Sequence, residues 1–128
     1  MRVSDIIKIK HGVQMHGLKR SMEKPLDFLH KIFLMLGVDF VVTDAMRPLN
    51  GNEKSLHPKG HAIDFRTRDL SHLQKAALLV LLTKYLGNDY DVIEYDTHMH
   101  IEYQRQIDDN KPANFIGVFG QDNFGTVE

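Results

Sequence analysis

Apolar residues recur at helical spacing from residue 25 to residue 36. They are Leu26, Leu29, Ile32, Phe33 and Leu36. This spacing places them along one face of an α-helix, so the segment is predicted to be an amphipathic helix. Pro25 suits the first turn of a helix, and Gly37 stands where a helix commonly ends.

A second helix is predicted to begin after Ser71. Ser71 and Gln74 are three residues apart and form a capping-box pattern, and Gly87 would end the helix. Its apolar positions are Leu73, Ala76, Ala77, Val80, Leu81 and Tyr85. We expect this stripe to pack in the core.

Four short segments have the composition of strands: residues 38–44, 60–66, 91–95 and 98–103. In the second segment, alternation puts Asp64 and Arg66 on one face and His61 and Phe65 on the other. A polar loop with turn residues is predicted for 45–59, and the tail from 108 to 128 has no assignment. The pattern predicts one α+β domain over residues 1–128, with a small antiparallel sheet of about four strands and two or three helices.

The composition restricts the chemistry. The chain has 128 residues and no cysteine, so any metal must be held by nitrogen and oxygen ligands. A net charge of −1 gives no broad basic field for nucleic acid, although Lys59 and residues 66–68 make a modest basic patch. We find no apolar run of the length of a signal peptide or membrane span. We expect a monomer made in the cytoplasm, delivered to the cell wall or periplasm by another route if it acts there.

Two clusters, at 55–64 and 98–102, contain four of the eight histidines and carry the candidate chemistry. His57 and Asp64 are separated by six residues, and His98 and His100 are two apart on a predicted strand. If the strands that carry Asp64 and His100 are neighbours, His57, Asp64 and His100 can converge on one point. Two imidazoles and a carboxylate would hold one zinc ion and leave a fourth position for water, as in catalytic zinc sites.

A hydrolytic zinc site also needs a group that accepts a proton. His98 is the best candidate for this general base, because it lies beside the predicted ligands without being needed as one. Glu94, four residues upstream, is a candidate to orient His98, and Asp96 is the competing choice.

The two clusters, SxHxxGxAxD at 55–64 and HxH at 98–100, resemble the signature of a zinc peptidase family. The family includes the D-alanyl-D-alanine carboxypeptidases, the L-alanyl-D-glutamate endopeptidases of phage lysins, the lysostaphin-type endopeptidases and the hedgehog signalling domain. The resemblance runs from about residue 40 to 103. It implies the hedgehog/DD-peptidase fold, with His57, Asp64 and His100 as zinc ligands and His98 as the catalytic residue.

The segment TDAMRP at 43–48 is similar to another element of this family. The resemblance implies that Arg47 binds a substrate carboxylate or steadies the oxyanion, and that Ser55 hydrogen-bonds the substrate backbone. A guanidinium is always charged and can contact a carboxylate in a bidentate manner, which agrees with that role. The implied function is hydrolysis of peptidoglycan peptides, as a D-Ala-D-Ala carboxypeptidase or a stem-peptide endopeptidase of phage or prophage origin. The alternatives are a zinc-holding binding or virion module without catalysis, and hydrolysis of another amide.

Overall fold

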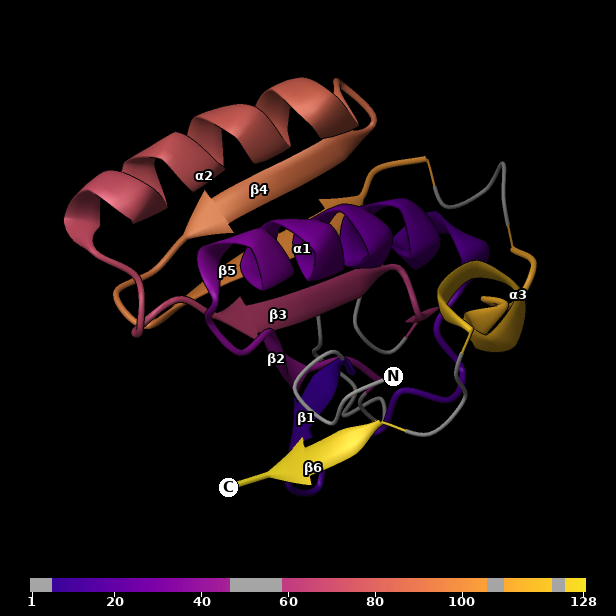
Figure 1. Ribbon diagram of the computed structural model, residues 1–128. Coiled ribbons are helices and arrows are strands. Elements are labelled where there is room, and N and C mark those ends of the chain that lie inside the picture. The colour runs from indigo at the N-terminus through magenta and orange to yellow at the C-terminus, as the bar shows by residue number, and fades with distance from the viewer. Residues whose placement is uncertain (1–5, 47–58, 106–109, 121–123) are drawn as a thin grey trace.

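Helices and strands of the computed structural model form an α+β architecture (Figure 1). The structure describes residues 6–46, 59–105, 110–120 and 124–128. Within these ranges one six-stranded sheet has the order β4-β5-β3-β2-β1-β6. The strands are β1 (Lys8–Lys10), β2 (Val41–Asp44), β3 (Ala62–Arg66), β4 (Tyr90–Glu94), β5 (His98–Tyr103) and β6 (Gly125–Val127).

The α+β prediction is confirmed, but the predicted sheet is too small and its purely antiparallel character is wrong. The four predicted strands correspond to β2 to β5, and the pairs β2–β3, β3–β5 and β4–β5 are antiparallel. The sheet is extended by β1, which pairs parallel with both β2 and β6. Both added strands have only three residues, too few to show alternation in a sequence, and their pairing joins distant parts of the chain.

The first predicted helix is α1 (Glu23–Leu36), which begins two residues earlier than expected and follows a 3₁₀ turn, η2 (Arg20–Met22). Gly37 ends α1 in the left-handed conformation at φ 70°, and its N–H bonds to the carbonyls of Phe33 and Leu34. A short third helix, α3 (Phe115–Phe119), lies in the tail that had no assignment. Among the described residues, none of these helices has the length and hydropathy needed to cross a membrane.

The second helix, α2 (His72–Leu86), has the predicted cap. Ser71 Oγ accepts from the N–H of Gln74, and the Gln74 side chain accepts from the N–H of Ser71. The predicted packing face is wrong, however, because all six residues named for it are exposed: Leu73, Ala76, Ala77, Val80, Leu81 and Tyr85.

Instead, α2 buries a leucine row at four-residue spacing, Leu78, Leu82 and Leu86. Since α2 is apolar on most of its circumference, its sequence contains two competing stripes. The leucine row is buried, whereas the other stripe stays exposed, although its Tyr85 stacks on Phe28 of α1 with ring centroids 4.3 Å apart. The periodicity alone could not decide between the two stripes.

The helices α1 and α2 lie over one face of the sheet (Figure 1). There Phe33, Phe40 and Phe65 contact one another, with ring centroids 5.3 to 6.0 Å apart. Ile63 and Phe65 are fully buried in this core, whereas Asp64 is not. The predicted alternation along β3 is therefore confirmed, and Asp64 lies on the face away from the helices.

Candidate functional site

The pairing of β3 with β5 positions the candidate site. Asp64 lies directly opposite His100, and Arg66 lies opposite His98. Residues directly opposite in an antiparallel pair project from the same face of the sheet. All four side chains therefore share the face opposite the helices, and the strand neighbourhood that the predicted metal site requires is present.

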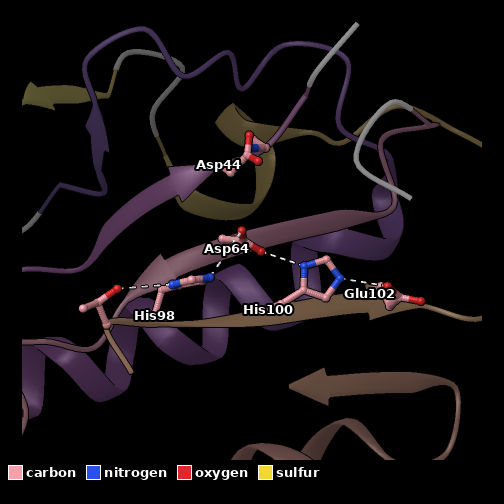
Figure 2. A network of polar contacts seen from close by, with 7 residues as sticks. Asp44, Asp64, His98, His100 and Glu102 are labelled. Atoms are coloured by element: carbon pink, nitrogen blue, oxygen red, sulfur yellow. Dashed lines mark hydrogen bonds and ion pairs between the residues drawn. The ribbon is translucent and has the colours of Figure 1, made fainter. Parts of the chain in front are cut away.

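His100 lies between two carboxylates (Figure 2). Its Nδ1 is 2.7 Å from Oδ1 of Asp64, and its Nε2 is 2.8 Å from Oε1 of Glu102. The second oxygen of Glu102 accepts from the Gln104 side-chain amide at 2.9 Å. Because a carboxylate oxygen only accepts hydrogen bonds, both contacts of His100 are made at once when both ring nitrogens carry a proton.

The surroundings of His100 shift its affinity for a proton. Burial of the imidazole lowers its pKa, because burial disfavours the charged form. The hydrogen bonds to Asp64 and Glu102, together with the charges of these carboxylates, raise the pKa by more. The net effect is a pKa above the ordinary value for histidine.

His98 lies beside this pair and has a different environment. Its Nε2 is 3.9 Å from Oδ2 of Asp64, which is too long for a hydrogen bond, and its Nδ1 is 3.4 Å from the Thr97 hydroxyl. The Tyr95 ring stacks on the imidazole with centroids 4.7 Å apart. The side chain is 34% exposed, so His98 is held in place and still open to solvent.

The structure does not bring Glu94 to His98. Glu94 pairs with Met99, which is fully buried on the helix-covered face, so Glu94 projects from the opposite side of the sheet to His98. Both Glu94 and Asp96 line a hollow against α2. The contacts that hold His98 come from Thr97 and Tyr95, and neither residue was singled out from the sequence.

The remaining predicted site residues, Arg47, Ser55 and His57, lie outside the described residues. In the described ranges no group of three or more His, Cys, Asp or Glu side chains is arranged to hold a metal ion. Asp64 and His100 are two of the three predicted ligands, so the described part of the chain shows a partial donor set.

Asp64 and His100 fit a zinc ion in their chemistry and nearly in their spacing. An imidazole nitrogen and a carboxylate oxygen bound tetrahedrally to zinc lie about 3.3 Å apart. The two atoms are 2.7 Å apart here, so they would separate by about 0.6 Å. If Nδ1 binds the metal, Nε2 still donates to Glu102, and such a carboxylate behind a ligating histidine is typical of metal sites.

A cavity of about 410 Å³ opens beside these residues. It extends from Lys10 at the end of β1, past Asp44 and Asp64, to His98 on β5. Asp44 is the register partner of Asp64 on β2, after an irregularity in the strand pairing, and its Oδ1 accepts from the N–H of Ala45 at 3.0 Å. A ligand in this cavity would reach Asp64 and His98 together.

Comparison with protein-family models, with curated proteins and with solved structures found no match to this chain.

Proposed function

We propose that this chain is a zinc-dependent peptidase that hydrolyses peptidoglycan peptides, with the metal held by His57, Asp64 and His100. The observation that carries the proposal is the direct approach of Asp64 to His100 across two paired strands, beside a cavity that Asp64 and His98 both line. The spacing of His57 from Asp64 in the sequence supplies the third ligand.

A bound zinc ion polarises a substrate carbonyl and lowers the pKa of its water ligand toward about 7. The protein's own contribution is to hold the ligands and to move protons. Glu102 keeps the His100 ring oriented, because it accepts from Nε2 while Nδ1 faces Asp64. Asp64 is anchored on the central strand β3, next to the rigid aromatic core.

His98 is the proposed general base and, later, the general acid. Its Nε2 points toward Asp64 from the cavity wall. A proton accepted by Nε2 would therefore stay within reach of a peptide bound in the cavity. Stacking by Tyr95 and the contact with Thr97 limit rotation of the ring. These contacts take the orienting role that was predicted for Glu94.

The substrate class rests on the resemblance of the two histidine clusters to peptidoglycan peptidases. Under this proposal Arg47 binds a substrate carboxylate and Ser55 hydrogen-bonds the substrate backbone. The products distinguish the two variants of the reaction. A carboxypeptidase releases D-alanine, and an endopeptidase creates new amino termini within the stem or cross-bridge.

The test is digestion of purified peptidoglycan followed by mass spectrometry. The parent protein should cleave, lose activity with a chelator and regain it with zinc. The His98→Ala variant should keep zinc and lose at least about a hundredfold in rate, since general acid–base groups contribute that much or more. His72→Ala, an exposed histidine at the start of α2, is the matched control and should cleave normally. A zinc-loaded parent that cleaves nothing would contradict the enzyme and favour a non-catalytic binding module.

A further inference from the structure

Three cationic side chains line the cavity and have no part in the proposed proton transfer. They are Lys10 at the end of β1, Arg66 at the end of β3 and Arg68 just beyond it. The sequence showed only a basic patch at 59 and 66–68. The structure brings Lys10, from a distant strand, to the same cavity as the two arginines, and Lys59 does not line it.

Some basic residues in the described ranges are paired with a carboxylate, and these three are not. Lys8, Lys31 and Arg105 each lie within 4 Å of a carboxylate. Among the described residues, Lys10, Arg66 and Arg68 form no such ion pair. Arg66 donates from Nη2 to the backbone oxygen of Glu128 at 3.2 Å, which leaves further guanidinium N–H groups for a ligand.

Three acidic residues, Asp44, Asp64 and Glu128, line the same cavity, so its side-chain charges are balanced. Asp64 already contacts His100 and is a proposed metal ligand, and Asp44 accepts from the backbone N–H of Ala45. Arg66 and Arg68 nevertheless offer charged N–H groups to an anionic group of a ligand.

We propose that Lys10, Arg66 and Arg68 form a subsite for a carboxylate of the peptide substrate, separate from the role given to Arg47. The identity of this peptide rests on the proposed function. Arg66 follows Asp64 by two strand residues, a spacing of about 7 Å. A carboxylate bound there would lie one or two residues from the bond that is cut. A planar guanidinium suits a carboxylate because it can bind both oxygens.

Two carboxylates of a peptidoglycan stem have this chemistry. One is the terminal carboxylate, and the other is the α-carboxylate of a D-glutamate that is linked through its side chain. The probe is the pentapeptide L-Ala-γ-D-Glu-L-Lys-D-Ala-D-Ala, prepared as the free acid, with only the D-glutamate α-carboxylate amidated, with only the terminus amidated, and with both amidated. Calorimetric titration of the full chain in the absence of zinc measures binding without any cleavage.

The parent should bind the free acid roughly tenfold or more tightly than the doubly amidated peptide, as expected for loss of a charge-assisted contact. Arg66→Gln and Arg68→Gln should each remove most of that difference. Arg105→Gln, an exposed arginine beyond the far end of β5, is the matched control and should retain it. One of the two singly amidated peptides should bind as weakly as the doubly amidated peptide. The carboxylate that is amidated in that peptide is the one that the subsite binds.

Equal binding of the acid and the doubly amidated peptide by the parent, or no binding of either, would overturn the subsite. So would a preference for the acid that persists in both arginine variants. Arg68 is exposed and makes no hydrogen bond in the described structure, so its variant remains informative if Arg66→Gln fails to fold. Hydrolysis is not needed for this measurement, so a lack of peptidase activity would leave a positive binding result intact.

Discussion

Replacement of Glu102 tests whether the polar network around His100 is organised to hold a metal. Glu102 accepts from Nε2 of His100 at 2.8 Å, and its side chain is only 21% exposed. A partly buried carboxylate in this position fixes the ring and makes the other nitrogen, Nδ1, a better ligand. Loss of such a partner typically weakens metal binding by about 10-fold to 100-fold.

Two substitutions separate the hydrogen bond from the charge. Glu102→Ala removes both and should weaken zinc binding by the full 10-fold to 100-fold. Glu102→Gln keeps a carbonyl oxygen that can accept from Nε2, so its loss should be smaller. Competition against a chromogenic chelator at a fixed neutral pH measures both affinities.

The matched control is Glu94→Gln, which removes a carboxylate from the helix-covered side of the neighbouring strand β4. It should leave the zinc affinity unchanged. If Glu102→Ala bound zinc as tightly as the parent, the network around His100 would have no role in metal binding. An equal loss in the Glu94 variant would show that the effect reflects overall charge instead of the contact with His100.

The remaining predictions concern stability and follow from the same structure. In chelator-treated protein, burial lowers the pKa of His100 and its two carboxylate partners raise it by more, so protonation of His100 stabilises the fold. This contribution is fully present below the unfolded pKa of about 6.5 and is lost as pH rises through the higher folded pKa. Urea titrations should therefore show a smaller difference between the parent and His100→Gln at pH 8.5 than at pH 6, and a constant difference would refute this linkage. Leu82→Ala should lower the free energy of unfolding by about 2–5 kcal/mol and Leu81→Ala by less than about 0.5 kcal/mol, because Leu82 is fully buried and Leu81 is 51% exposed. Equal losses would contradict the packing of α2. Ser71→Ala removes the cap of α2 and should cost about 1 kcal/mol in the same assay, whereas an unchanged midpoint would mean that the cap is replaced by solvent.

The sequence predicted correctly those features of the fold that depend on residues close together in the chain. The cap at Ser71 and the glycine end of α1 depend on residues within one turn of the helix, and both are present as predicted. The strands β1 and β6 depend on partners far along the chain. Their three residues carry too little pattern for a local prediction, and only parallel pairing defines them as strands.

The same distinction explains which parts of the site could be read from the sequence. Side chains two apart on one strand share a face, so His98, His100 and Glu102 all project from the same side of β5. Glu102 was therefore available to this reasoning, although it was not singled out. Glu94 was placed near His98 by its spacing of four residues, but a turn lies between them. The N–H of Tyr95 bonds to the carbonyl of His98, and this turn pairs Glu94 with Met99.

The alternation rule therefore holds inside a strand and fails across a turn, unless the register of the hairpin is known. A hairpin in which Tyr95 bonds to His98 makes Glu94 and Met99 opposite residues, and Met99 has to lie in the core between two polar histidines. The burial pattern of β5 thus fixes the face of Glu94 before any side-chain geometry is considered. The rule could not have placed Lys10 in the cavity at all, because its position comes from the parallel pairing of β1 with β2. Residues that act from one strand can be predicted from the sequence, whereas a subsite assembled from β1 and β3, which are far apart in the chain, requires the fold.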